Sequence, residues 1–168
     1  MNEESEEAGY PDDQNPPPSS DSIPAPEPAS PNQDNIKEGE MELEELTGRV
    51  IGCAIAVHRE LGPGFVETIY ENALIVELRH MEIPFQAQGE RPIFYRGEMV
   101  GLQRFDLLVA EQLVVELKTL KALEAIHFAQ VRSYLKALRL NHGLLFNFAS
   151  MPLTIKRVIY RGAESDPS

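Results

Sequence analysis

The chain has 168 residues, of which 27 are Asp or Glu and 15 are Lys or Arg, so its formal charge at pH 7 is −12. Residues 1–40 carry −10 (one basic, 11 acidic) and residues 41–168 carry only −2 (14 basic, 16 acidic), which leaves nucleic acid open as a partner. A single cysteine excludes an intrachain disulfide, and no apolar run comes near the roughly 20 residues of a membrane helix, so we expect a cytoplasmic protein without a membrane partner.

The first 40 residues have the composition of a disordered, acidic, Pro/Ser-rich tail. They contain 8 of the 13 prolines and few aliphatic side chains. Such a segment buries too little apolar surface to offset the entropy that it would lose on ordering. A solubilising tail is one interpretation. A docking segment, or an acidic mimic that covers a basic groove of the same protein, is the other.

Two helices are predicted next. From Glu42, apolar residues recur at steps of three and four as far as Leu61, which is the spacing of one helix face. A Gly-Pro-Gly sequence at 62–64 ends this helix, and a second helical pattern covers about residues 66–80.

The rest of the chain changes between strand and helix patterns. Residues 123–138 have helical periodicity, and the remaining segments are rich in β-branched, aromatic and aliphatic side chains. The expected strands are 84–88, 92–95, 99–109, 113–118, 144–148 and 153–160. Because about 120 residues can form one core, we expect a single mixed α/β domain over residues 41–163, followed by a short flexible C-terminus, 164–168.

Three charged residues, Asp106, Glu116 and Lys118, interrupt an otherwise apolar hairpin. If its loop is residues 110–112, antiparallel pairing places Asp106 directly opposite Glu116. Residues two apart on a strand point to the same face, so Lys118 shares that face with both carboxylates. A shift of one residue in the pairing would put them on opposite faces.

Two carboxylates and one ammonium on an apolar sheet face need a reason, because unpaired charges there are costly. A divalent cation is one such reason, since Mg²⁺ prefers carboxylate oxygens and retains several waters. Asp106 and Glu116 would be its ligands, joined by the backbone carbonyl of Leu117. Lys118 would assist the attacking water or offset negative charge on a pentacovalent phosphate. The alternative is an internal ion pair in which Lys118 bridges the two carboxylates.

Two helical stripes accompany this group. His127, Gln130 and Tyr134 share one face of the third predicted helix, and Glu67 and Tyr70 lie on one side of the second. Both also have an ordinary interpretation. The first is then a half-buried helix face, and Glu67 is an acid that the helix dipole favours in a first turn.

A cationic stripe on the third predicted helix gives an electrostatic footprint of the kind that nucleic-acid binding leaves. Arg132, Lys136 and Arg139 are spaced by four and three residues, so they lie on one helix face. Binding through such contacts predicts a marked dependence on salt.

Taken together, these motifs resemble the GxxExxY protein family, which is placed in the PD-(D/E)xK nuclease superfamily. The resemblance covers nearly all of residues 43–161. It rests on Gly64-x-x-Glu67-x-x-Tyr70, Asp106, Glu116-x-Lys118 and Gln130-x-x-x-Tyr134. Phe105 stands where the name of the superfamily has proline, at a position where the chemistry does not require one.

The resemblance implies a restriction-endonuclease-like core, in which helices flank a central mixed β-sheet, and hydrolysis of phosphodiester bonds with Mg²⁺ or Mn²⁺. By position, Asp106 and Glu116 resemble the metal ligands, and Lys118 the catalytic lysine. Glu67 resembles the helix carboxylate that completes the metal site. Gln130 and Tyr134 resemble the pair that orients the lysine, the water or a DNA phosphate.

The expected function is therefore that of a metal-dependent nuclease, with DNA as the favoured substrate. One alternative is a non-catalytic nucleic-acid- or protein-binding module that retains the fold. Another is a regulatory protein whose acidic tail is the working part. Because so small a domain contacts few base pairs, a homodimer or a partner subunit would fit, although no residue indicates it.

Overall fold

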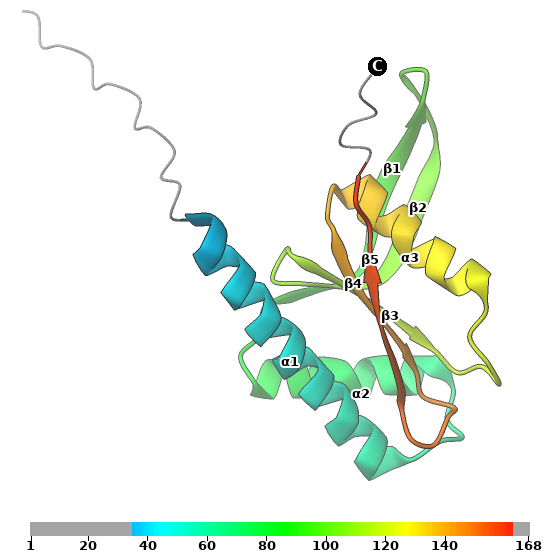
Figure 1. Ribbon diagram of the computed structural model, residues 1–168. Coiled ribbons are helices and arrows are strands. Elements are labelled where there is room, and N and C mark those ends of the chain that lie inside the picture. Colours follow the sequence, from blue (N-terminus) through cyan, green and yellow to red (C-terminus); the bar gives the residue numbers. More distant parts are fainter. Residues whose placement is uncertain (1–34, 163–168) are drawn as a thin grey trace, which may run out of the picture. The chain divides into compact units, whose positions relative to one another are not determined.

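A computed structural model describes the backbone of residues 35–162 and the side chains from Leu43 onward (Figure 1). The helices are α1 (Asn35–Leu61), α2 (Glu67–His80) and α3 (Ala125–Leu138). The strands are β1 (Phe85–Tyr95), β2 (Glu98–Val109), β3 (Leu113–Lys118), β4 (His142–Asn147) and β5 (Thr154–Ile159). The expected tail lies outside the described residues as far as residue 34, and so does the expected C-terminal segment 164–168.

The five strands form one sheet in the order β1-β2-β3-β4-β5. Neighbouring strands pair antiparallel, except for β3 and β4, which are parallel. A parallel pair needs a long crossover connection, and α3 supplies it because it lies between these two strands in the chain. The predicted α/β class, a central mixed sheet flanked by helices, is confirmed.

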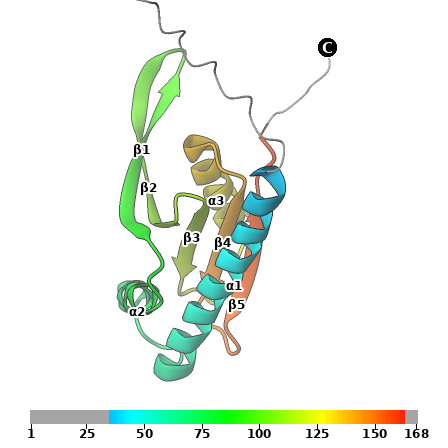
Figure 2. The same cartoon turned by 90° about the vertical axis from the view of Figure 1, so that its left-hand side faces the viewer.

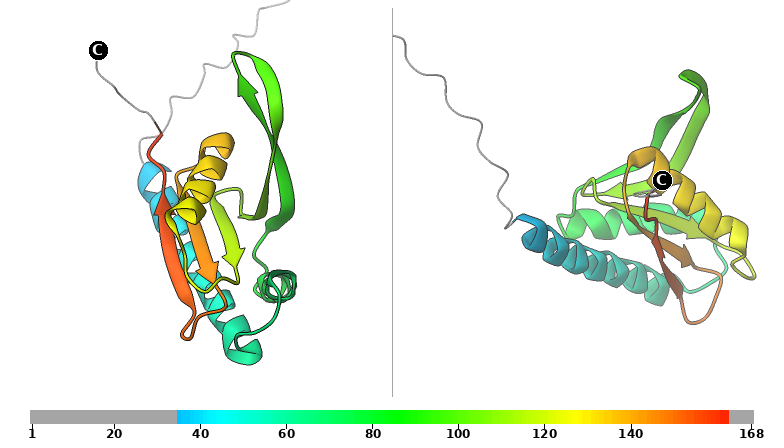
Figure 3. Two further views of the ribbon diagram at one scale, coloured as in Figure 1. Left: turned by 90° about the vertical axis from the view of Figure 1, so that its right-hand side faces the viewer. Right: turned by 45° about the horizontal axis from the view of Figure 1, so that its top comes forward.

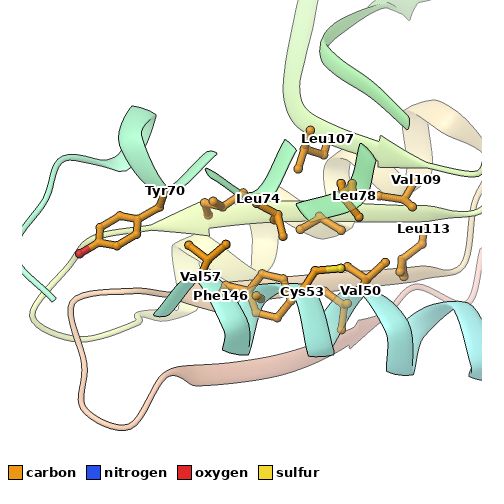
Figure 4. Close-up of a cluster of buried hydrophobic side chains, with 14 of the residues drawn as sticks. Val50, Cys53, Val57, Tyr70, Leu74, Leu78, Leu107, Val109, Leu113 and Phe146 are labelled. Carbon is orange, nitrogen blue, oxygen red and sulfur yellow. The ribbon is translucent and has the colours of Figure 1, made fainter. Parts of the chain in front are cut away.

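Helices cover both faces of the sheet, and each face has its own apolar core. One core joins α1 and α2 to the sheet through buried side chains such as Val57, Leu74 and Leu113, which are among those labelled in Figure 4. The second core joins α3 to the opposite face, through Val114 and Leu135 among others. Figures 2 and 3 show α1 and α3 on opposite sides of the sheet.

Helix α1 begins at Asn35, seven residues before the predicted start at Glu42. The residues in between are mostly polar, so a pattern of apolar positions could not reveal these first turns. The helix ends at Leu61, as predicted, and Gly62 follows with a left-handed φ of 66°. Among residues 35–162, no helix is both long enough and apolar enough to cross a membrane.

The two strands predicted at residues 84–88 and 92–95 are one continuous strand, β1. Gly89, which marks a break in the sequence pattern, lies inside this strand and opposite Phe105 of β2. A Cβ atom on residue 89 would come within 2.1 Å of the Phe105 ring. Glycine therefore serves here for close packing and not for a turn.

Strands β1 and β2 continue as a two-stranded arm beyond the point where β2 leaves β3. Their pairing reaches Tyr95 and Glu98, whereas β2 pairs with β3 only over its last three residues. Figure 1 shows the arm extending past the rest of the sheet. Phe94 and Met99, a cross-strand pair near its tip, are each 61% exposed.

Candidate active site

The hairpin of β2 and β3 has the register that the sequence predicts. Leu107 pairs with Val115, and Val109 pairs with Leu113. The pairing of β2 with β3 ends at Leu107 and Val115, and beyond it the side chain of Asp106 connects the two strands. Its Oδ2 accepts a hydrogen bond of 2.9 Å from the backbone N–H of Leu117. Asp106 is thus fixed at the fork between the two strands.

Glu116 and Lys118 lie on the face of β3 that α3 covers. Side chains alternate along a strand, and Val114, two residues before Glu116, belongs to the core under α3. Glu116 is only 2% exposed. The ammonium of Lys118 donates a hydrogen bond of 2.6 Å to Oε1 of Glu116. The predicted sharing of one face by these two residues therefore agrees with the core packing.

The second carboxylate oxygen of Glu116, Oε2, is buried without a hydrogen-bond partner in the described part of the chain. Buried polar atoms are nearly always paired, so such an atom needs an explanation. Burial, the nearby negative charge of Asp106 and a hydrogen bond with the Asp106 carboxyl raise the pKa of Glu116 to about 7, against the lowering effect of Lys118. One ammonium therefore does not offset the two carboxylates. A divalent cation fits this donor set, because it binds carboxylate oxygens and supplies the missing charge.

The alternative of an ion pair bridging both carboxylates is not what forms. In the described residues Lys118 makes one salt bridge, to Glu116, and Asp106 instead binds the backbone of Leu117. Burial lowers the pKa of Lys118, but its hydrogen bond to Glu116 and the surrounding carboxylates outweigh this and raise it.

Glu67 reaches the same region from the first turn of α2. The pKa of its carboxyl is raised, mainly by burial and also by the charge of Asp106. The charge of Lys118 and a hydrogen bond with the backbone of Thr119 act in the opposite direction. Glu67 therefore feels the charges of the hairpin. Within residues 43–162, however, no three His, Cys, Asp or Glu side chains are arranged as a metal-binding group. Glu67 stands near the other two carboxylates without joining them in one cluster.

Tyr70 and Gly64 explain how α2 is positioned. The buried hydroxyl of Tyr70 donates a hydrogen bond of 2.6 Å to the carbonyl of Gly62 and accepts one of 3.1 Å from the N–H of Phe65. Its ring stacks on Phe148 at a centroid distance of 4.6 Å. Gly64 has a φ of 116°, a conformation that favours glycine. These residues fix the loop from which Glu67 begins the helix.

Helix α3 brings Gln130 and Tyr134 to the carboxylates. Gln130 donates a hydrogen bond of 2.6 Å from Nε2 to the hydroxyl of Tyr134, which is 4% exposed. Burial, followed by the charges of Glu116 and Asp106, raises the pKa of this phenol well above its usual value. His127, the third member of the predicted stripe, instead accepts a hydrogen bond from the N–H of Glu124 and caps the helix.

Asn147, at the end of β4, is a polar residue of this region to which the sequence pattern assigns no role. It is 2% exposed, and its side chain accepts a hydrogen bond of 3.0 Å from the N–H of Leu120 and donates one of 2.7 Å to its carbonyl. Next to it, the N–H of Phe148 donates to the carbonyl of Lys118 at 2.8 Å. Asn147 thereby holds the loop after Lys118. A lone amide at the end of the apolar run of β4 was the signal.

One comparison with known proteins identifies a family. A family model described as the PD-(D/E)XK nuclease superfamily matches residues 44–158. No curated protein matches the chain. A solved structure titled "Crystal structure of SSO0001" is similar at 18% identity and a TM-score of 0.45, over 55% of this chain and 48% of that one. The chain thus spans about half the length of that protein, a likeness too weak to carry an argument.

The family match and the mixed sheet with its three helices are consistent with the restriction-endonuclease-like fold that the sequence predicts. The match extends from the beginning of the described side chains in α1 to β5, so it includes every element that contributes to the candidate site. The chain therefore belongs to the PD-(D/E)XK nuclease superfamily.

Proposed function

We propose that the chain is a metal-dependent nuclease that hydrolyses phosphodiester bonds, with DNA as the favoured substrate. Membership of a nuclease superfamily supports a nucleic-acid substrate. The Gly64, Glu67 and Tyr70 spacing supports assignment to the GxxExxY branch of that superfamily. Cytoplasmic location and assembly as a homodimer or with a partner subunit remain predictions.

The observation that carries the proposal is the buried Oε2 atom of Glu116, which no donor group of the described residues satisfies, beside a second carboxyl group, that of Asp106. Replacing a buried ion pair by apolar residues of similar volume is often neutral or stabilising, so packing alone gives no reason for an acid at this position. Here one oxygen is held by Lys118, the other is buried without a partner, and Asp106 lies close enough to raise the pKa of Glu116. Burying these carboxylates lowers the stability of the fold. The same carboxylate oxygens would be suitable ligands for a divalent cation.

Asp106, Glu116 and the carbonyl of Leu117 would hold Mg²⁺ or Mn²⁺, with Glu67 as the further carboxylate. Such an ion polarises a phosphoryl oxygen and lowers the pKa of water. The Lys118 ammonium, oriented by Glu116, would assist the attacking water and offset the charge that develops on the phosphorus oxygens. Gln130 and Tyr134 form a hydrogen-bonded pair that would orient the lysine, the water or a phosphate.

A cleavage assay with labelled single- and double-stranded DNA and RNA, in Mg²⁺ or Mn²⁺, tests the proposal. We expect wild-type cleavage that EDTA abolishes. Glu116→Gln and Lys118→Ala should each reduce the rate at least about 100-fold, because each removes preorganised charge at the reacting centre. Matched controls are Glu98→Gln and Lys121→Ala, which change exposed residues of the same types.

Activity that persists in Glu116→Gln, or that needs no divalent ion, would contradict the proposal. Calorimetry with Mg²⁺ and Mn²⁺ gives a second measurement on the same proteins. Nucleic-acid binding without cleavage and without metal binding would favour the non-catalytic module. Loss of activity in the two controls would show that the assay reports surface charge and not the site.

A further inference from the structure

A cationic groove lies between the C-terminal end of α3 and the end of β5, away from the candidate active site. Its volume is about 670 Å³, within the roughly 300–1,000 Å³ that is usual for ligand sites. The residues that line it are Lys136, Arg139, Leu140, Asn141, Tyr160, Arg161 and Gly162. Within residues 43–162, this lining includes three cationic side chains and no acidic one.

The walls of this groove are fixed by the fold. Beyond the end of α3, Arg139 has a left-handed φ of 57°, and the N–H of Leu140 donates a hydrogen bond of 2.9 Å to the carbonyl of Leu135. The N–H of Tyr160 donates one of 2.9 Å to the carbonyl of Asn141, which ties β5 to the start of β4. Figures 1 and 3 show the end of α3 close to the end of β5.

The three cations are exposed at the rim of the groove, and the ring of Tyr160 is half-buried beside them. Arg132, also exposed, lies one turn before Lys136 on the same helix face and extends the row. Cations in a row suit a repeating anion better than a single one. An aromatic ring beside them suits a sugar or a base.

We propose that this groove binds the sugar–phosphate backbone of nucleic acid, at a contact site separate from the reacting centre. The inference rests on the proposed nuclease function for the identity of its ligand. Gln130 and Tyr134 of α3 face the carboxylates, whereas Lys136 and Arg139 face solvent at the other end of the helix. The groove therefore anchors a part of the nucleic acid that lies away from the scissile bond.

The separation of the two sites sets the length of nucleic acid that can use both. The groove adjoins Asn141, just before β4, and the loop after Lys118 is held by Asn147 at the end of β4. Six strand residues at about 3.3 Å each span about 20 Å. B-DNA rises about 3.4 Å along its axis for each base pair, so this distance corresponds to about six base pairs.

The test measures binding of a fluorescein-labelled 24-base-pair DNA duplex, and of an RNA duplex of the same sequence, by fluorescence anisotropy. EDTA is present throughout, so the readout does not depend on cleavage. The full chain carrying Lys136→Gln with Arg139→Gln should bind at least about tenfold more weakly at low salt. The slope of log K against log salt should become less steep by about 2, because each phosphate contact contributes about 0.9.

The matched control is Arg59→Gln with Arg79→Gln, which removes the same charge from exposed positions of α1 and α2. We expect its affinity to change less than about threefold and its slope to stay the same. Arg161→Gln, added to the groove pair, should reduce the slope by about 1 more. Equal losses in the groove pair and the control pair would overturn the proposal, as would a wild-type chain that binds neither duplex.

Cleavage measured in parallel separates this inference from the proposed function. Binding that depends on the groove, in a chain that cleaves nothing with Mg²⁺ or Mn²⁺, would support the groove and contradict the nuclease. Cleavage of the 24-base-pair duplex with the same KM in the wild type and in the groove pair would support the nuclease and overturn the groove.

Discussion

The buried carboxyl of Glu116 lowers the stability of the fold and is also a proposed metal ligand. Its carboxyl group is almost fully buried, one oxygen is paired with Lys118 and the other is unpaired. Desolvation and the charge of Asp106 make ionisation of this group unfavourable. Packing alone gives no reason for an acid here, so the position would link stability to the proposed metal binding.

The pH dependence of stability follows from this burial. The pKa of Glu116 is about 7 in the folded chain and 4.5 for an unperturbed carboxyl. The folded state therefore binds the proton more tightly, and this contribution to stability is present below about pH 4.5 and is lost as pH rises toward 7. In EDTA, Glu116→Gln should be more stable than wild type at pH 8, by on the order of 2 kcal/mol, with little difference at pH 5.

Thermal unfolding of both proteins at pH 5 and pH 8 measures this difference. Glu98→Gln, at an exposed position on the arm, is the control and should follow wild type at both values. Mg²⁺ should raise the Tm of wild type at pH 8 and leave the Gln variant nearly unchanged, since a ligand stabilises only the state that binds it. A Gln variant that is less stable than wild type at pH 8 would contradict this account.

At the scale of single residues, the sequence predicted the positions of Glu116 and Lys118 on β3 better than the hydrogen-bond partners of Asp106 and Asn147. The pairing of Leu107 with Val115 and the face shared by Glu116 and Lys118 follow from the two-residue period of a strand, once the loop length is known. The fork at which Asp106 binds the backbone of Leu117 does not follow, because no local pattern shows where two paired strands separate. Asn147 gave a weak signal, since one amide in an apolar run does not reveal which loop it holds.

At the scale of elements, close packing between β1 and β2 requires a glycine at residue 89. Phe105 is 1% exposed and lies over Gly89, so the two strands can approach only if residue 89 has no side chain. The sequence pattern placed a break between two strands at this point. The contact that requires the glycine comes from another strand, and a pattern read along one segment cannot show it.

Gly89→Ala should therefore destabilise the chain by about 1–3 kcal/mol, because the added methyl group overpacks a core site. The Phe105 ring, with which the new Cβ would clash, is buried and has little room to move. Gly101→Ala is the matched control on β2, where a Cβ would meet no atom within 4 Å. Urea unfolding curves measure both, and equal stability of the two variants would contradict the packing argument.

At the scale of the whole molecule, the distribution of charge determines how the chain meets a polyanion. Residues 1–34 include nine acidic and no basic side chains, so their removal changes the formal charge from −12 to −3. Helix α1 begins at Asn35, and such a truncation leaves every described element complete. The cationic side chains of the groove and of α3 therefore act in a chain whose net charge opposes nucleic acid.

The chain without residues 1–34 should bind a DNA duplex several-fold more tightly than the full chain at 50 mM NaCl. The reason is that like charges repel phosphates over a Debye length, which is roughly 10 Å at 0.1 M salt. Anisotropy titrations in EDTA measure the difference, which should disappear near 300 mM NaCl. A full-length variant with the nine acidic residues replaced by Asn or Gln is the control, and it should behave like the truncated chain if charge alone matters.

The salt dependence also distinguishes the two interpretations of the acidic segment. Repulsion at a distance is screened by salt, so it predicts a difference between full-length and truncated chains that vanishes as the Debye length shortens. A segment that covers the groove as an acidic mimic makes close ion pairs, which are screened less, and would still weaken DNA binding at 300 mM NaCl. Equal affinity of both chains at 50 mM would contradict any electrostatic role, because nine negative charges on the same chain would then leave the approach of DNA unaffected.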